Sequence, residues 1–151
     1  MSIPDGLRAL EGDWTGSNKL WFTPTDPARL SQTTASVRTA AQGRFFTMGY
    51  TWADEGKPQD GLLTLGIDPA TQTIAASWLD SFHMSHAIMT CSGPAGGEVS
   101  VKGTYSVPGY PDWGWRISVD PETADAFTLR MFNISPEGEE ALAVEASYRR
   151  S

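Results

Sequence analysis

The sequence predicts an all-β protein: an antiparallel up-and-down β-barrel of about ten strands with a short N-terminal helix. The first indication is the even spread of turn signals rich in Gly, Pro and Asp along the chain. The second is that the segments between them, about ten residues each, alternate in polarity with the period of a half-buried strand. The third is that a helical period of 3.6 residues is confined to the N-terminal segment.

The expected elements follow the chain in order. A helix is expected over residues 3–10, where Pro4 suits a helix start and Leu7 and Leu10 share one face. The links between strands have hairpin length, so neighbouring strands are expected to run antiparallel and to close into a barrel without free edges. The expected strands are residues 13–23, 32–41, 44–54, 60–68, 72–80, 84–92, 98–106, 113–120, 125–134 and 140–149.

Two links are expected to form type I turns, Asp68–Thr71 and Asp120–Thr123. In each, Asp stands at the first turn position and Pro at the second, which are the positions these residues favour. The segment 93–97, rich in Gly and Pro, is expected as a further hairpin turn, because it lacks the lysine and the following helix of a phosphate-binding loop.

Alternation also assigns side chains to the two faces of each strand. In residues 44–53, Phe46, Met48, Tyr50 and Trp52 share one side, which we expect to face the core. Similar inward rows are expected within 63–67, 74–80, 113–119, 127–131 and 142–148. The inward aromatic side chains either line a cavity for a flat or aliphatic ligand or fill a small barrel. They are Phe22, Phe46, Tyr50, Trp52, Trp78, Trp113 and Trp115.

Length, charge and cysteine content narrow the class of protein. The 151 residues suit a single domain spanning 1–151 that needs no disulfide or metal to fold. The net charge of −7 and the pI of about 4.7 argue against partners such as nucleic acid or an anionic membrane surface. The single cysteine, Cys91, favours a reducing compartment, and residues 1–6 lack the pattern of a signal peptide. We therefore expect a cytoplasmic protein.

Two polar residues on the expected inward faces are candidates for ligand contacts. Asp80 shares its face with Trp78, where a buried carboxylate needs a partner and could orient a ligand; alternatively, it ends the strand and caps the following turn. His86 either contributes a hydrogen-bonding group or general base to a cavity or is simply structural. His83 would point to the opposite face of the same strand, so the two histidines are not expected to form a metal site.

An ordered set of short motifs resembles one known family. The motifs are Leu10-Glu-Gly-Asp-Trp-Thr-Gly16, Gly43-Arg-Phe-Phe46 with Gly49-Tyr50, Gly61-Leu-Leu-Thr-Leu-Gly-Ile-Asp68, Ser77-Trp-Leu-Asp-Ser81 and Tyr148-Arg-Arg150. Together they resemble the bacterial family catalogued as domain of unknown function 1579, whose barrel is calycin-like, that is, similar to the lipocalins. The long link 23–30 and the aromatic-rich segment 110–115 depart from the family pattern and are expected to shape the barrel mouth.

The resemblance implies a calycin-like barrel without an established activity. It further implies that Arg150 from the last strand covers Trp14 and closes one end of the barrel, which leaves the opposite end as the ligand entrance. Nitrobindin-like barrels of the wider group hold haem through a histidine late in the chain, and no histidine follows His86 here. We therefore expect no haem, and no cofactor or metal of another kind.

Three functions remain open from the sequence. We favour a module that binds a small apolar or amphipathic molecule and works as a monomer or homodimer. The alternatives are an enzyme of isomerase or hydrolase type that uses Asp80 and His86, and a filled barrel that acts through its surface. The residues expected to contact a ligand are Phe46, Tyr50, Trp52, Trp78, Asp80, His86, Trp115 and Met131.

Overall fold

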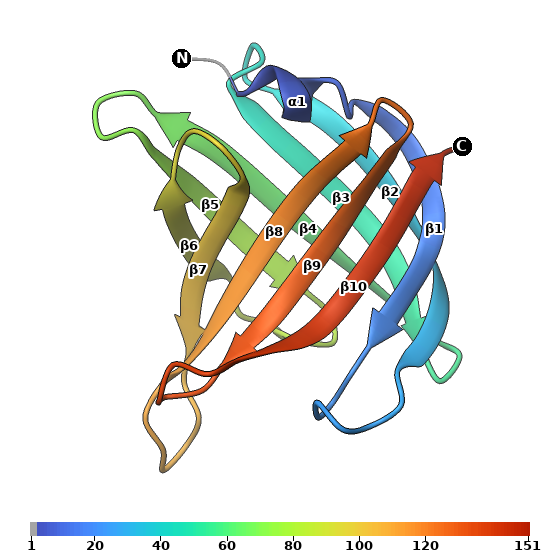
Figure 1. Cartoon of the computed structure of the whole chain (residues 1–151), viewed down its shortest axis with the longest axis vertical. Helices are drawn as coiled ribbons and strands as arrows, with labels where there is room; N and C mark the ends of the chain where they lie inside the picture. Colours follow the sequence, from blue (N-terminus) through green and yellow to red (C-terminus); the bar gives the residue numbers. More distant parts are fainter. Residues whose placement is uncertain (1–2) are drawn as a thin grey trace.

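A computed structural model describes residues 3–151 as a closed antiparallel barrel with one short helix (Figure 1). Each strand pairs with its neighbours in the chain, and β1 pairs with β10 to close the ring. The expectation that no signal peptide is present concerned residues 1–6, and of these Met1 and Ser2 lie outside the described residues. The elements are α1 (Asp5–Arg8), β1 (Gly12–Leu20), β2 (Arg29–Ala40), β3 (Phe45–Asp54), β4 (Lys57–Asp68), β5 (Thr73–Asp80), β6 (Met89–Pro94), β7 (Val99–Tyr105), β8 (Trp113–Thr123), β9 (Ala126–Ile134) and β10 (Glu140–Arg150).

The predicted fold class and order of strands are confirmed, with two local corrections. The strand predicted over 84–92 is wrong in its first part, because residues 81–88 form a turn and a short link, and β6 begins only at Met89. The turn predicted at Asp120–Thr123 is also displaced. These residues continue β8, which stays paired with β9 up to Thr123, and the chain reverses at residues 124–125.

The other predicted turn is confirmed in position after Asp68, but it is one residue longer than a type I turn, because its main-chain hydrogen bond joins Asp68 to Gln72 and not to Thr71. The backbone N–H of Ala70 donates to Asp68 Oδ1 at 2.9 Å, and the N–H of Gln72 donates to the Asp68 carbonyl oxygen at 2.9 Å. The aspartate therefore supplies both the side-chain and the main-chain acceptor of the turn.

The strands run alternately between two ends of the barrel, which differ in their links. The closed end, at the top of Figure 1, carries α1 and the links 41–44, 69–72, 95–98 and 124–125. The opposite end, which we call the mouth, carries the links 21–28, 55–56, 81–88, 106–112 and 135–139. The two segments that depart from the family pattern, 23–30 and 110–115, both lie at the mouth.

The closed end is sealed by Trp14 and Arg150, the pair that the family resemblance implies. Trp14 Nε1–H donates to the Leu10 carbonyl oxygen at 2.8 Å. The Arg150 guanidinium lies 4.4 Å above the centre of the Trp14 ring, where a cation is attracted by the indole face. The same guanidinium also donates to three backbone carbonyl oxygens, those of Ala9 at 2.6 Å, Ala124 at 2.9 Å and Glu11 at 3.0 Å.

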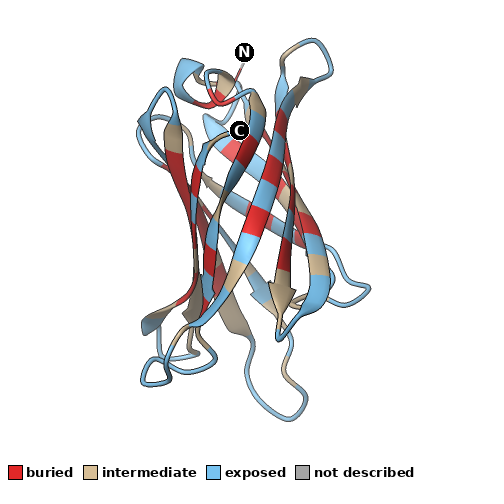
Figure 2. Cartoon of the chain, turned by 90° about the vertical axis from the view of Figure 1, so that its right-hand side faces the viewer, coloured by how far each residue is buried: buried red, intermediate tan, exposed pale blue. Residues whose placement is uncertain are grey.

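Buried and exposed residues alternate along most strands, as the polarity pattern predicts (Figure 2). Phe46, Met48, Tyr50 and Trp52 on β3 are all buried. Phe22 is a correction: β1 ends at Leu20, so Phe22 lies in the mouth link, and 51% of its surface is exposed.

The ring is less regular between β6 and β7 than elsewhere. These two strands are in ladder register at one residue pair, Ser92 with Lys102. By contrast, β7 and β8 stay in register from Val99↔Val119 to Tyr105↔Trp113. The β6–β7 seam is therefore the least continuous of the strand pairings in the described part of the chain.

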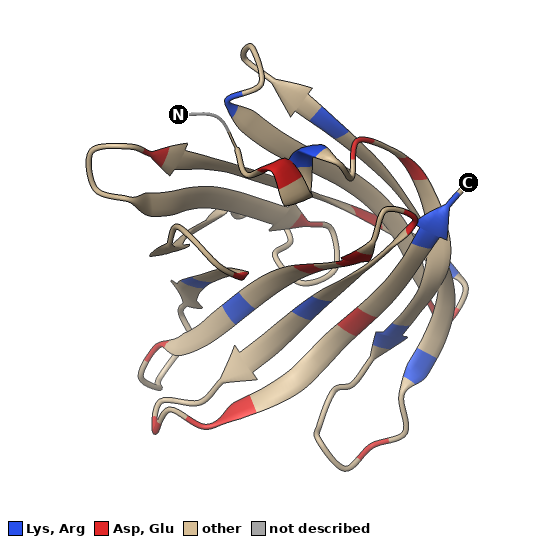
Figure 3. Cartoon of the chain, turned by 45° about the horizontal axis from the view of Figure 1, so that its top comes forward, with Lys and Arg blue, Asp and Glu red and all other residues tan. Residues whose placement is uncertain are grey.

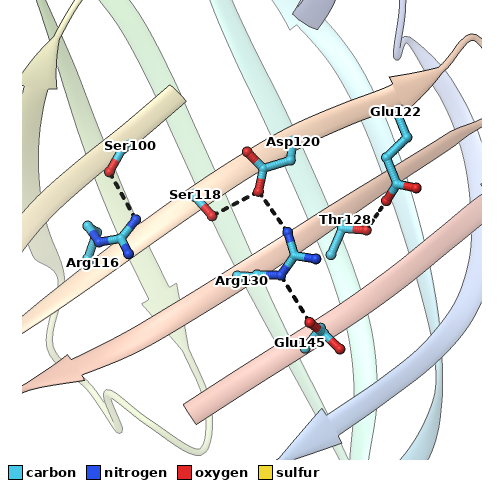
Figure 4. Close-up of polar contacts among 8 residues, drawn as sticks. All are labelled: Ser100, Arg116, Ser118, Asp120, Glu122, Thr128, Arg130 and Glu145. Atoms are coloured by element: carbon cyan, nitrogen blue, oxygen red, sulfur yellow. Dashed lines mark hydrogen bonds and ion pairs between the residues drawn. The ribbon is translucent and has the colours of Figure 1, made fainter. Parts of the chain in front are cut away.

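The outer surface carries interspersed charges of both signs (Figure 3). On β8, β9 and β10, Arg130 bridges Asp120 at 3.1 Å and Glu145 at 3.0 Å, and Ser118 donates to Asp120 at 3.2 Å (Figure 4). Such paired charges are typical of a solvated strand face. Within residues 3–151, no helix is both long enough and apolar enough to cross a membrane.

Candidate functional site

Three neighbouring strands place Tyr50, Gly61 and Asp80 in one row across the wall of the barrel near the mouth. Tyr50 on β3 is the register partner of Gly61 on β4, and Gly61 is the partner of Asp80 on β5. A Cβ atom at Gly61 would overlap the Tyr50 hydroxyl, so the absence of a side chain lets the tyrosine reach across β4. The Tyr50 hydroxyl donates to Asp80 Oδ2 at 2.7 Å.

Asp80 is a buried carboxylate, 3% exposed, that accepts four hydrogen bonds. Besides the Tyr50 hydroxyl, Oδ2 accepts the Trp52 Nε1–H at 3.3 Å. Oδ1 accepts the backbone N–H groups of Phe82 and His83 at 2.8 and 2.9 Å. The expectation that Asp80 ends the strand and caps the following turn is therefore confirmed, and its burial with partners fits a carboxylate at this depth. A contact between Asp80 and a ligand stays a prediction.

The turn capped by Asp80 brings the His83 ring to the inner side of the mouth. Its centroid lies 5.6 Å from that of Trp52, 5.8 Å from that of Trp78 and 5.4 Å from that of Trp115. Within residues 3–151, the hydrogen bond that fixes His83 is made by its backbone N–H, and its ring nitrogens form none. The ring is thus held by contacts with aromatic neighbours, of which Phe82 is the nearest, edge-on at 5.1 Å.

Trp115 on β8 is the most unusual member of this aromatic group. Its ring stacks on Trp78 with centroids 5.4 Å apart and an interplanar angle of 10°, and it meets Tyr105 edge-on. Trp78 Nε1–H donates to the Tyr50 hydroxyl at 2.9 Å, and the Tyr105 hydroxyl donates to Asn133 Oδ1 at 2.5 Å. Trp115 Nε1–H has no acceptor within residues 3–151, although the residue is only 6% exposed. An unpaired buried donor of this kind costs about 1–3 kcal/mol.

Two cavities meet at His83 and Trp115. The first, of about 500 Å³, extends along the links 21–28 and 135–139 to the start of β10. The second, of about 620 Å³, extends toward β6 and β7 and is walled by Met89, Thr104 and Tyr105 among others. Both volumes fall within the usual range for small-molecule sites, roughly 300–1,000 Å³.

The interior beneath the mouth is filled by side chains. A space of only about 10 Å³ remains there, among residues that include Tyr50, Trp52, Asp80 and Met131. Of the two interpretations of the inward aromatic residues, filling therefore applies at this depth, whereas cavities occur at the mouth.

The structure brings most of the predicted ligand-contact residues to one region. Tyr50, Trp52, Trp78 and Asp80 share the hydrogen bonds described above, and Trp115 joins them by stacking on Trp78. Met131 lines the small space beneath, with Tyr50, Trp52 and Asp80.

Two predicted residues lie outside this group. Phe46 is fully buried in the half of β3 nearer the closed end and lines none of the three spaces described here. His86 is exposed in the 81–88 link, so its predicted inward position is wrong, because the strand assumed there does not form.

His83 is the residue that the strand assignment missed. Assigning a strand to residues 84–92 turned His83 away from Trp78 and placed His86 on the inward face. The signal that could have corrected this was Asp80 followed by Ser81, which is typical of a residue capping a turn. Ending β5 at Asp80 releases His83 from the two-residue alternation of a strand.

Burial controls the protonation of the groups at the site. Burial raises the pKa of Tyr50 well above its usual value, and the adjacent Asp80 carboxylate adds to this effect. Burial lowers the pKa of His83, against the opposing attraction of Asp80 and Asp54. Burial also raises the pKa of the Cys91 thiol to about 11. At neutral pH the site therefore presents a hydroxyl donor and a neutral imidazole, and Cys91 remains a thiol.

No group of three or more His, Cys, Asp or Glu side chains within residues 3–151 is arranged to hold a metal ion.

Comparison with known proteins identifies one sequence family. The family model described as "Protein of unknown function (DUF1579)" matches residues 5–150. No curated protein matches the sequence.

Solved structures show the same fold at low sequence identity. Rv2717c from M. tuberculosis is 12% identical, with a TM-score of 0.60 over 99% of each chain. The S-type phycobiliprotein lyase CPES from Guillardia theta is 14% identical, with a TM-score of 0.56 over 100% of this chain and 93% of its own. A de novo designed fluorescence-activating β-barrel is 11% identical, with a TM-score of 0.52 over 99% of this chain and 100% of its own.

Proposed function

The chain belongs to the DUF1579 family of proteins of unknown function, and from that premise we propose that its barrel binds a small amphipathic molecule at the mouth. The observation that carries this proposal is the buried, unpartnered Trp115 Nε1–H beside two cavities of ligand size. Aromatic walls suit a flat apolar body, and the free indole N–H suits a hydrogen-bond acceptor on that body.

Binding is better supported than catalysis. Both carboxylate oxygens of Asp80 are engaged as acceptors, which suits a structural role more than proton transfer. The pairing of Asp80 with His86 that an enzyme would use has no geometric support, because His86 is exposed. The high pKa of Cys91 disfavours a thiolate nucleophile.

The fold of the structural neighbours is compatible with this role. Two of them are named as a phycobiliprotein lyase and a fluorescence-activating barrel. At 14% and 11% identity, that likeness concerns the fold alone. We also expect a cytoplasmic protein that works as a monomer or homodimer, and both expectations stay predictions.

The test uses the fluorescent probe 8-anilinonaphthalene-1-sulfonate, which combines flat apolar rings with sulfonate acceptors. We expect the wild-type protein to bind one equivalent. Trp115→Phe keeps most of the aromatic wall but removes the N–H donor, and we expect it to weaken binding about fivefold, the value of one modest hydrogen bond. The control is Phe45→Leu, which changes a partly exposed aromatic residue at the closed end.

Two results would contradict the proposal. One is equal weakening by Trp115→Phe and Phe45→Leu, which would place the probe on the general surface. The other is the absence of saturable binding to the folded wild-type protein. Native mass spectrometry of gently purified protein adds an independent measurement, because a reproducible small-molecule adduct would give the mass of the natural ligand.

A further inference from the structure

His83 occupies a position that no other described residue shares. Its side chain lines the 500 Å³ cavity, the 620 Å³ cavity and the 10 Å³ space beneath them. Trp115 is the other residue common to the two large cavities. The His83 ring therefore forms part of the wall between these spaces, and Trp115 forms another part.

The Trp115 Nε1–H is buried, so an outside acceptor reaches it when a group that covers Trp115 moves. Three rings surround it: Trp78, Tyr105 and His83. Trp78 is tied to the Tyr50 hydroxyl and Tyr105 to Asn133, so displacing either breaks a hydrogen bond.

The His83 ring moves at lower cost. Within residues 3–151 its ring nitrogens form no hydrogen bond, and its backbone N–H is anchored to Asp80. The ring can thus rotate about its side-chain bonds while the turn stays in place. This rotation gives up stacking contacts, which a flat ligand body can replace.

We propose that His83 is the size-determining residue of the mouth site: a ligand with two or more rings and an acceptor group displaces the His83 ring, joins the two cavities and accepts the Trp115 Nε1–H. This inference rests on the proposed binding function and specifies its ligand class. Smaller ligands remain on one side of the ring. The exposed His86, on the same link, has no part in the selection.

The first test follows the wild-type protein by NMR. His83 and His86 are the only histidines in the sequence, so their ring resonances can be assigned by comparison with His86→Ala. Because the His83 ring is stacked on Trp52 and packed against Trp78 and Trp115, its protons should resonate upfield of those of His86. Addition of 8-anilinonaphthalene-1-sulfonate should remove most of this shift and leave His86 unchanged. Saturable binding with an unmoved His83 resonance would overturn the proposal and leave the binding function standing.

The second test measures size selection with that probe and with benzenesulfonate, which carries the same acceptor group on a single ring. His83→Ala should strengthen binding of the anilinonaphthalene probe about tenfold relative to benzenesulfonate. His83→Phe retains a ring of similar reach, and His86→Ala changes the exposed histidine; both should keep the wild-type ratio. An unchanged ratio in His83→Ala would overturn the proposal.

The outcomes separate the two ideas. If the wild-type protein binds neither probe, the proposed function is contradicted. Binding gained by His83→Ala would still support the role of His83 as the residue that separates the two cavities. Absence of binding in both proteins overturns both. Thermal unfolding of each variant verifies that the comparison is made between folded proteins.

Discussion

The two ends of the barrel use the same kinds of residue for opposite purposes. At the closed end, Trp14 is hydrogen-bonded, covered by Arg150 and packed edge to face on Phe127 at 4.7 Å. At the mouth, Trp115 is also buried, yet its N–H is unpaired and cavities adjoin it. The comparison shows that a buried tryptophan marks a candidate binding site through its unsatisfied N–H, and that burial alone does not distinguish the two roles.

The largest expected effect concerns the point where the filled interior meets the mouth. Asp80→Ala removes the acceptor of four hydrogen bonds and leaves the Tyr50 hydroxyl and the turn amides without partners. We expect a loss of about 3–5 kcal/mol in the free energy of unfolding. Urea denaturation followed by circular dichroism measures it. A loss below about 1 kcal/mol would mean that water replaces the carboxylate and that the turn does not depend on it.

Next comes a glycine pair that tests the packing of the same wall. Gly61→Ala places a methyl group against the Tyr50 hydroxyl, and we expect about 2 kcal/mol of destabilisation from overpacking. The matched control is Gly49→Ala on β3, where no atom lies within 4 Å of the added Cβ. Thermal unfolding of the two variants should separate them clearly. Equal stabilities would show that Tyr50 moves aside without cost.

A smaller effect is expected at the closed end. Arg150→Ala removes the cation over Trp14 and the hydrogen bonds to backbone carbonyls, for an expected loss of about 1–2 kcal/mol. The exposed neighbour Arg149 is the control, and Arg149→Ala should change stability by less than about 0.5 kcal/mol. Neither variant should alter binding of the anilinonaphthalene probe. Altered probe affinity in Arg150→Ala would weaken the division of roles between the two ends.

The smallest expected effect is a pH dependence from His83. Its pKa is lowered by burial in the folded protein, so the unfolded chain binds its proton more readily. Stability from this group is complete above the ordinary histidine pKa of about 6.5 and is lost as the pH falls below that value. We expect the midpoint of thermal unfolding to fall less between pH 7.5 and 5 in His83→Phe than in wild-type protein. His86→Ala should behave like the wild type, and identical pH profiles for all three proteins would contradict this assignment.

The fold could be predicted from the sequence because the alternating pattern recurs in nearly every strand. Phe46, Met48, Tyr50 and Trp52 illustrate this, since each follows the two-residue period and each is buried. The position of Arg150 over Trp14 could be predicted as well, but only through resemblance to a family.

The centre of the candidate site was harder to predict because it does not follow strand periodicity. His83 lies in a turn whose conformation depends on Asp80, a contact between a side chain and the backbone that alternation does not encode. The reach of Tyr50 across Gly61 depends on the register of three strands. The missing partner of Trp115 Nε1 is a property of the packed structure, and no sequence pattern reports it.

The irregular pairing of β6 with β7 has a consequence for how the barrel opens. Backbone amides exchange their hydrogens with solvent during local separations of strands, and these separations occur first where pairing is least continuous. The amides of β6 and β7 should therefore exchange sooner than those of β2, β3 and β4, which pair over long continuous registers. Because Met89, Thr104 and Tyr105 wall the second cavity, each such separation also widens a passage into it. A ligand bound as proposed at the mouth would then have a route of exchange through this side of the barrel.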